Sequence, residues 1–277
     1  MQENHVKIVN PLPYYEKIGS GRRSMIFIHG FGTSRKSWYD ILPLLDCDYS
    51  IYLVDLIGCG DSPAPSNWAY TLMSQAEALY SLIKKESLSH LVLVGQSYGG
   101  GIVILLYFLL NKIGYHDLIE KLILIDPAIY PQKYPFFVKI PRIPLINHLV
   151  LSMIPPEIQV RSTLTSVFHN KDIITKERIN RFTSNIASSE RRHALIETAK
   201  NIVPENIEEI IKQIPLIVKP VKIIYGDSDP VIPHSNFRKL LAKLPNSEVY
   251  IMKECGHVPQ EEKPEDTAKI ILDFIAK

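Results

Sequence analysis

Leu91-Val92-Leu93-Val94-Gly95-Gln96-Ser97-Tyr98-Gly99 is a short apolar run that leads into a serine with a glycine two residues before it and another two residues after it. The apolar residues from Gly100 to Lys112 follow at once and predict a buried helix. A serine in the tight turn between a strand and a helix has a strained backbone, and the glycines let the two elements approach without Cβ clashes. The pattern therefore predicts that the Ser97 hydroxyl projects above a sheet as a candidate nucleophile.

Further short segments rich in Val, Ile and Leu predict a parallel sheet around this turn, because strands buried on both faces read as continuous apolar runs. Together with Leu91–Val94, these segments are Met25–Ile28, Ile51–Val54, Leu122–Ile125, Val221–Tyr225 and Glu248–Met252. Helical patterns alternate with them, at Tyr70–Glu86, Gly100–Lys112, Asn236–Lys243 and Glu265–Ala276. We therefore expect helices on both faces of the sheet.

An earlier segment, Tyr14–Ile18, ends at Gly19-Ser20-Gly21. Glycines at the end of a strand pattern are typical of a hairpin turn. We therefore expect this segment to pair with the Met25 strand and to form an antiparallel edge of the sheet.

The alternation of strand and helix stops between Pro127 and about Lys219, where helical patterns occur without strands and prolines are frequent. We interpret residues 128–219 as a helical cap inserted into a core formed by residues 1–127 and 220–277. The cap carries 13 basic and 8 acidic residues, a balance of +5, whereas the core carries 18 and 21, a balance of −3. There is no internal repeat, so the chain is expected to be one domain with an insertion.

The overall composition is that of a folded protein with little net charge. Hydrophobic residues make up 46%, and 31 basic against 29 acidic residues leave a net charge of +2. No run of like charge is long enough to follow a nucleic acid backbone. Met1–Asn10 lacks the features of a secretory signal, and the longest apolar run, Ile102–Leu110, is too short to span a bilayer. We therefore expect no nucleic acid partner, no integral membrane segment and a cytoplasmic location; the sequence gives no indication of oligomeric state.

Motifs for cofactors and metals are incomplete. Arg35 stands where a phosphate-binding P-loop requires its last glycine, and no third glycine completes a dinucleotide fingerprint after Gly58 and Gly60. Pro230 and Val231 occupy positions where a calcium loop needs oxygen ligands. The three cysteines lack the spacing of a zinc site. The expected activity therefore needs no cofactor and no metal.

The chain resembles the α/β-hydrolase superfamily over nearly its whole length, in particular its capped serine hydrolases of the esterase and lipase type. Five motifs in the family's order carry the resemblance: His29-Gly30-Phe31-Gly32, Asp55-Leu56-Ile57-Gly58-Cys59-Gly60-Asp61-Ser62, the turn at Ser97, Gly226-Asp227-Ser228-Asp229 and Gly256-His257. The resemblance implies a mostly parallel eight-stranded sheet covered by helices on both faces, with the helical cap inserted after the sixth strand.

A serine hydroxyl needs a base within hydrogen-bond reach, and the base needs a partner that fixes its tautomer. The resemblance implies that His257 is this base and that Asp229 is the orienting acid, in the chain order nucleophile, acid, base. Asp126 and Asp227 also follow predicted strands. Asp126 is the reserve candidate for the acid, because some relatives place the acid after the sixth strand.

The oxyanion formed during acyl transfer must be met by preorganised donors. The Tyr98 amide lies at a predicted helix N-terminus, which favours negative charge. The resemblance gives Phe31 as the second donor, with Gly30 and Gly32 allowing its amide to turn inward and with His29 positioning the loop. Gly95 and Gly99 support the turn at the nucleophile.

Within the resemblance, a serine in the turn implies cleavage of an ester, thioester, lactone or carbon–carbon bond. We expect hydrolysis of carboxylic esters of small to medium apolar substrates through an acyl-enzyme intermediate. One alternative is a carbon–carbon bond hydrolase of aromatic ring-cleavage products, and another is a non-catalytic receptor for a small molecule. We further expect part of an apolar stretch in the cap to line a substrate pocket over Ser97. That stretch comprises Tyr134, Phe136, Phe137, Val138, Ile140, Ile143, Leu145 and Ile146.

Overall fold

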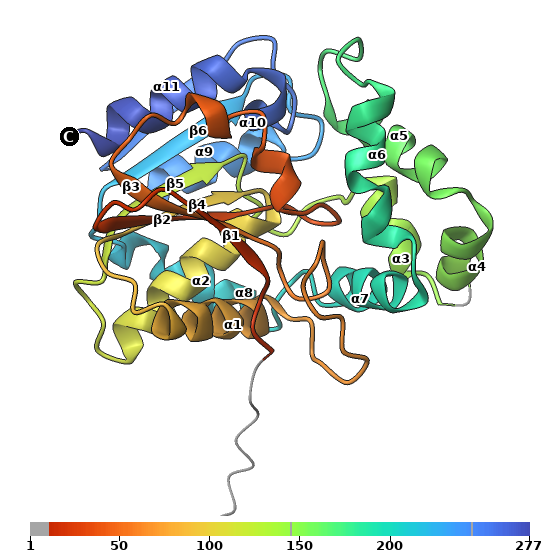
Figure 1. The fold of residues 1–277 in the computed structure, drawn as a ribbon, viewed down its shortest axis with the longest axis horizontal. Coiled ribbons are helices and arrows are strands. Elements are labelled where there is room, and N and C mark those ends of the chain that lie inside the picture. The colour runs from red at the N-terminus through yellow and green to blue at the C-terminus, as the bar shows by residue number, and fades with distance from the viewer. Residues whose placement is uncertain (1–10, 145, 245) are drawn as a thin grey trace, which may run out of the picture.

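The computed structural model describes residues 11–144, 146–244 and 246–277, and its centre is one mostly parallel sheet (Figure 1). The strands are β1 (Tyr15–Ile18), β2 (Arg23–Ile28), β3 (Tyr49–Val54), β4 (Leu91–Gln96), β5 (Ile119–Ile125), β6 (Val221–Gly226) and β7 (Ser247–Met252). They lie in the order β1-β3-β2-β4-β5-β6-β7. Every neighbouring pair is parallel except β1 with β3. The prediction of an α/β fold with a mostly parallel sheet is confirmed.

The sheet contains seven strands among the described residues, rather than the eight that the resemblance implied. Only the family resemblance implies an eighth strand. Seven segments of this sequence carry a strand pattern, and each of them forms a strand. Met1–Asn10, the segment without the features of a secretory signal, lies outside the described residues.

The predicted hairpin between β1 and β2 is wrong, because β1 pairs with β3 instead. The connection from β1 to β2 crosses close to the start of β3. A Cβ on Gly19 would lie 2.5 Å from the carbonyl oxygen of Tyr49, and one on Gly21 would lie 2.3 Å from that of Asp48. The two glycines therefore permit a close crossing rather than a hairpin turn, and β2 has no free edge because β3 and β4 flank it.

Side chains alternate along the central strands between two buried layers, which confirms that helices cover both faces (Figure 1). Ile26 and Ile28 of β2 pack into one layer, while Met25 and Phe27 pack into the other. The first layer includes α1 (Leu72–Lys85), α2 (Tyr98–Lys112), α8 (Ile207–Gln213) and α9 (His234–Lys243). The second includes the 3-10 turn η1 (Arg35–Trp38) and α11 (Pro264–Ile275).

Between β5 and β6 the described residues form helices without a strand. These are α3 (Phe136–Arg142), α4 (Ile146–Met153), α5 (Pro156–Val167), α6 (Lys176–Thr183), α7 (Ser189–Lys200) and α8. Figure 1 shows α3 to α7 grouped to the right of the sheet, whereas α8 lies beside α2. The division of the chain at residues 128 and 219 stays a prediction. The remaining short elements are α10 (Pro259–Glu262), η2 (Leu42–Leu44), η3 (Ser184–Ile186) and η4 (Ile214–Leu216).

None of the helices that the structure describes is both long enough and apolar enough to cross a membrane.

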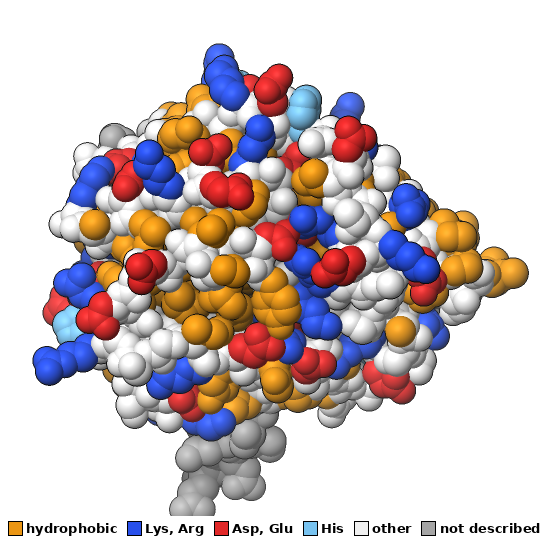
Figure 2. Space-filling model, turned by 45° about the horizontal axis from the view of Figure 1, so that its top comes forward, with side chains coloured by type: hydrophobic (Ala, Val, Ile, Leu, Met, Phe, Trp, Pro, Cys, Tyr) orange, Lys and Arg blue, Asp and Glu red, His pale blue; other side chains and the backbone are white. Residues whose placement is uncertain are grey.

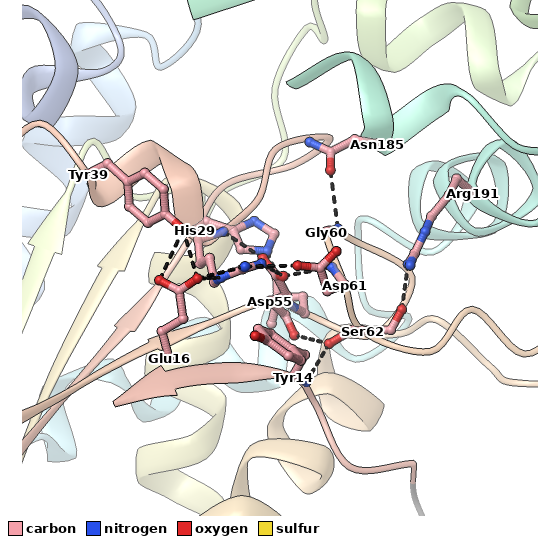
Figure 3. A network of polar contacts seen from close by, with 12 residues as sticks. Tyr14, Glu16, His29, Tyr39, Asp55, Gly60, Asp61, Ser62, Asn185 and Arg191 are labelled. Carbon is pink, nitrogen blue, oxygen red and sulfur yellow. Dashed lines mark hydrogen bonds and ion pairs between the residues drawn. The ribbon is translucent and has the colours of Figure 1, made fainter. Parts of the chain in front are cut away.

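A buried polar network at the end of β3 is centred on Asp55 (Figure 3). Asp55 Oδ1 accepts the amide of Arg35 at 2.7 Å, and Oδ2 accepts both the Arg35 guanidinium and the amide of Asp61. Arg35 also pairs with Glu16 at 2.7 Å and with Asp61 at 2.8 Å. Gly60 has a φ of 52°, and a Cβ there would lie 2.1 Å from Asp55 Oδ2. The network therefore fixes the loop after β3 against the loop after β2.

The segment between β5 and β6, which we call the helical segment, contributes two residues that contact the loop after β3, as Figure 3 shows. Asn185 Oδ1 accepts the amide of Gly60 at 3.2 Å, and Arg191 Nη1 donates to the carbonyl oxygen of Ser62 at 2.6 Å. The motif that begins at Asp55 thus connects the sheet to the helices that lie beside it.

Asp55→Asn should lower the free energy of unfolding by about 3 kcal/mol, because it leaves the buried Arg35 without its closest counter-charge. The measurement is urea denaturation followed by circular dichroism. Glu120→Gln is the matched control, since Glu120 pairs with the half-exposed Arg23 and should contribute less than about 1 kcal/mol. Equal effects of the two substitutions would contradict a stabilising role for the Asp55 network.

Candidate active site

The turn between β4 and α2 holds Ser97 in a left-handed backbone conformation, with φ of 51° and ψ of −115°. The glycines on either side are required by space. A Cβ on Gly99 would lie 2.3 Å from the carbonyl oxygen of Ile28, and one on Gly95 would lie 2.5 Å from that of Gly99. The backbone thus turns sharply at the carboxyl edge of the sheet and directs Ser97 Oγ toward the loops that follow β6 and β7.

Ser97, His257 and Asp229, which are far apart in the sequence, form a continuous hydrogen-bonded chain. His257 Nε2 lies 2.8 Å from Ser97 Oγ, and His257 Nδ1 lies 2.8 Å from Asp229 Oδ2. The other carboxylate oxygen, Asp229 Oδ1, accepts the amides of Val231 at 2.6 Å and Ile232 at 3.1 Å. Because Asp229 accepts hydrogen bonds only, Nδ1 carries the imidazole proton and Nε2 is free to accept one from the serine.

The neighbouring Asp227 lies outside this chain of hydrogen bonds. Its Oδ1 accepts the hydroxyl of Ser228 at 2.9 Å, and its Oδ2 lies 3.8 Å from Lys253 Nζ. Of the two predicted candidates after β6, only Asp229 contacts the imidazole in the structure.

Asp126, the reserve candidate, lies buried behind Asp229. Its Oδ1 accepts the amide of Gly226 at 3.0 Å, while its Oδ2 is buried and has no hydrogen-bond partner in the described part of the chain. Burial and the nearby charge of Asp229 raise the pKa of Asp126 well above its usual range. Asp126 therefore takes up a proton more readily than an ordinary carboxyl group does, whereas the two oxygens of Asp229 together accept three N–H groups.

Asp126, Asp229 and His257 each bring one potential ligand atom to within 4.8 Å of the others. A cation there would compete with hydrogen bonds already formed by His257 Nδ1 and by both oxygens of Asp229. The arrangement therefore favours the hydrogen-bonded chain over a metal site.

The loop after β2 faces Ser97 and is held by His29. Its Nε2 accepts the amide of Leu56 at 3.0 Å, so its Nδ1 donates to the carbonyl oxygen of Gly30 at 2.8 Å. Burial lowers the pKa of this imidazole, which keeps it neutral. Gly32 has a φ of 71°. The residues predicted as oxyanion donors, Phe31 and Tyr98, line the same cavity as Ser97.

Two supporting residues had no signal in the sequence. Gln96 Nε2 donates to the carbonyl oxygen of His257 at 2.8 Å and so helps to position His257. Gln96 occupies a variable position of the serine motif, which accepts any residue type. Glu262 accepts the amide of Gly256 at 2.9 Å. Glu262 is one of several acidic residues in this part of the chain, so the sequence does not single it out for this role.

A cavity of about 270 Å³ extends from Ser97 and His257 to the helical segment. Tyr134, Phe136, Phe137, Val138 and Ile140 of the predicted apolar stretch line it, whereas Ile143 and Ile146 do not. Leu145 lies outside the described residues. Further apolar side chains come from α4, α5 and α7, among them Leu151, Ile158 and Leu195. The cavity therefore offers an apolar surface next to the serine hydroxyl.

The charges around this cavity are few and of one sign. No Lys or Arg is among the described residues that line it, and Glu261 is its one carboxylate. Burial raises the pKa of Glu261 to about 7, although Arg178 pairs with it at 2.7 Å. Arg178 also pairs with Asp40 at 2.7 Å. Glu261 therefore belongs to a network of ion pairs that links α6 to the core.

Comparison with known proteins identifies the family. The model of the Alpha/beta hydrolase family matches residues 25–270. The chain is 29% identical over 264 residues to the uncharacterized hydrolase YugF of Bacillus subtilis, covering 95% of this chain and 93% of that protein. It is 25% identical over 272 residues to a 2-hydroxy-6-oxononadienedioate/2-hydroxy-6-oxononatrienedioate hydrolase of Klebsiella pneumoniae, with coverage of 94% and 89%.

Among solved structures, a thermophilic esterase from Thermogutta terrifontis has a TM-score of 0.77 at 21% identity, over 95% of this chain and 93% of that one. At this identity the likeness establishes the fold. The family model, in contrast, spans most of the sequence and includes β2 through most of α11. The chain belongs to the alpha/beta hydrolase family.

Proposed function

We propose that this hydrolase cleaves uncharged carboxylic esters of apolar acids through an acyl-enzyme intermediate, with Ser97 as nucleophile, His257 as general base and Asp229 as orienting acid. The 2.8 Å contact between His257 Nε2 and Ser97 Oγ supports direct transfer of the serine proton as Oγ attacks the ester carbonyl. Asp229 holds the tautomer and stabilises the imidazolium that forms. The imidazolium then protonates the leaving alcohol.

Deacylation repeats these steps with water as nucleophile. His257 accepts a proton from the water, the acyl bond to Ser97 breaks, and the carboxylic acid leaves while Oγ recovers its proton. In both tetrahedral intermediates, the amides of Phe31 and Tyr98 donate to the oxyanion. The location of Tyr98 at the first position of α2 supports this role, because helix N-termini present free amides and a favourable dipole.

The observation that carries the choice of substrate is the apolar cavity without a lysine or arginine among its described lining residues. A dienedioate, named for the relative from Klebsiella pneumoniae, has two carboxylates. In this cavity such groups would lose water without gaining a counter-charge from a lysine or arginine among the described lining residues. An uncharged ester avoids this cost, so ester hydrolysis ranks above the carbon–carbon bond hydrolase alternative.

A non-catalytic receptor for a small molecule ranks lower still. Such a protein has no need for a nucleophile, a base and an acid in hydrogen-bond contact, and these three groups are joined here by distances of 2.8 Å. Side chains held in this order are the geometric signature of nucleophilic catalysis.

Ser97→Ala should lower kcat/KM for p-nitrophenyl butyrate at least a thousandfold, because the triad acts as a unit. A fluorophosphonate should add one mass adduct to the wild-type protein and none to the variant, as measured by intact-mass spectrometry. Ser228→Ala is the control and should leave both readouts unchanged, because this hydroxyl donates to Asp227, which lies outside the hydrogen-bonded chain of Ser97, His257 and Asp229. Ester turnover by Ser97→Ala at more than a few per cent of wild type would refute the nucleophile.

Asp229→Asn should lower kcat about a thousandfold, since an amide leaves the imidazolium without a counter-charge and favours the wrong tautomer. Asp227→Asn and Asp126→Asn are the matched controls and should retain activity within about threefold. For Asp126 the reason is that the side-chain oxygen of an asparagine can still accept the amide of Gly226. A larger loss for Asp126→Asn than for Asp229→Asn, measured by steady-state kinetics, would assign the orienting acid to Asp126.

The value of kcat/KM should rise about fourfold per methylene from p-nitrophenyl acetate to about the hexanoate, because each buried methylene contributes about 0.8 kcal/mol. Ile140→Trp should remove most of this gain, since Ile140 of α3 lines the cavity. Ile143→Trp, directly after α3, should not, since Ile143 is exposed and does not line the cavity. A steady decline from acetate, together with cleavage of an aromatic dienoate, would favour the carbon–carbon bond hydrolase instead.

A further inference from the structure

The outer tip of the helical segment exposes an unusual concentration of large apolar side chains. Seven of the seventeen exposed ones among the described residues lie between positions 136 and 158. They are Phe136, Ile143, Ile146, Leu149, Met153, Ile154 and Ile158, and we call them the apolar tip. Figure 2 shows hydrophobic side chains projecting at the right-hand extremity of the molecule, the side on which Figure 1 places α4. The surface is therefore a projection rather than a groove.

The pattern of α4 makes one continuous face of this tip. Ile146, Leu149 and Met153 are separated by three and four residues, which puts them on the same side of a helix. Leu149 is 59% exposed and Met153 is 73% exposed, and Ile158 at the start of α5 is 57% exposed. Side chains of this size at such exposure mark a surface that binds a partner when they occur together.

The charge around the tip is strongly biased. Lys133, Lys139, Arg142 and Arg161 are exposed in this part of the chain, and Glu157 is the one acidic residue between positions 133 and 161. An apolar face with a basic rim is typical of segments that lie on an anionic lipid surface. Two copies of the same tip would bring like charges together, which opposes self-association through this surface.

The tip is also continuous with the cavity. Phe136, Ile154 and Ile158 line the cavity and are exposed at the tip as well. An apolar molecule that leaves a lipid layer beneath the tip would therefore reach the cavity along apolar side chains.

We propose that the apolar tip binds the surface of an anionic lipid layer, with its side chains among the headgroups and acyl chains and its basic rim against the lipid charges. This surface role goes beyond ester cleavage and does not depend on which bond the site hydrolyses. It directs the enzyme to the place where apolar substrates collect.

The test is flotation of full-length Ser97→Ala protein with vesicles of phosphatidylglycerol or of phosphatidylcholine, so that lipid hydrolysis cannot contribute. We expect binding to phosphatidylglycerol vesicles at least tenfold stronger than to phosphatidylcholine, and weaker in high salt. Equal binding to both, or binding to neither, would overturn the proposal without affecting the proposed ester hydrolysis, which is measured separately on a water-soluble ester.

Variants in the Ser97→Ala protein locate the surface. The pair Leu149→Ser and Met153→Ser should lower vesicle binding at least tenfold, and so should the pair Lys139→Glu and Arg161→Glu. The matched controls are the pair Leu216→Ser and Val218→Ser, exposed by 65% and 82%, and the pair Lys112→Glu and Lys176→Glu. Neither control should change binding.

Unchanged binding by the two tip variants, or equal losses in the controls, would overturn the proposal. A dimer in analytical ultracentrifugation that dissociates in the Leu149→Ser and Met153→Ser protein would overturn it as well, since the tip would then bind a second copy. With Ser97 restored, the Leu149→Ser and Met153→Ser protein should hydrolyse p-nitrophenyl acetate at the wild-type rate, because neither side chain lines the cavity.

Discussion

The left-handed backbone of Ser97 is the constraint on which the rest of the site depends. A residue with a Cβ rarely adopts this conformation, so the structure around it must supply compensating contacts. They come from both sides. The amide of Ser97 donates to the carbonyl oxygen of Ile125, and the Ser97 carbonyl accepts the amides of Gly100 and Ala128. Close packing at Gly95 and Gly99 prevents the turn from relaxing. The hydroxyl is thereby fixed at the edge of the sheet, where the loops after β6 and β7 can meet it.

The electrostatic environment of His257 depends on two neighbouring carboxyl groups, those of Asp229 and Asp126, which differ in their hydrogen bonds. Two carboxyl groups share a buried space, and two negative charges there would repel each other without water to screen them. Hydrogen bonds distinguish the two groups. Asp229 accepts two amides and the imidazole N–H, whereas Asp126 accepts one amide. The raised pKa of Asp126 reduces the repulsion that a second negative charge beside Asp229 would cause.

The sequence predicted best what depends on local pattern and worst what depends on tertiary pairing. The strands, the turn at Ser97 and the helices on both faces follow from apolar runs and glycine spacing, and they are present in the structure. The expected burial of Glu248–Met252 is wrong, because β7 is an edge strand on which Val249, Tyr250 and Ile251 are exposed. The strand that pairs with β1 does not follow from such patterns, because Gly19 and Gly21 are compatible with a hairpin turn as well as with a close crossing of the chain. The raised pKa of Asp126 and the contact of Gln96 with His257 arise from burial and from residues far apart in sequence, so no motif indicates them.

The helical segment contributes backbone hydrogen bonds to the site that its sequence pattern does not indicate. The amide of His257 donates to the carbonyl oxygen of Val167 at the end of α5, and Glu262 of α10 accepts the amides of Gly256 and of His169 and Asn170, which follow α5. The loop that carries His257 is therefore anchored to the end of α5, the same helix that lines the cavity and begins at the exposed tip. A force that shifts α5, such as contact of the tip with a lipid layer, would act on the cavity wall and on the position of His257 together. The proposed binding at the surface and the proposed chemistry at Ser97 would thus be connected through α5.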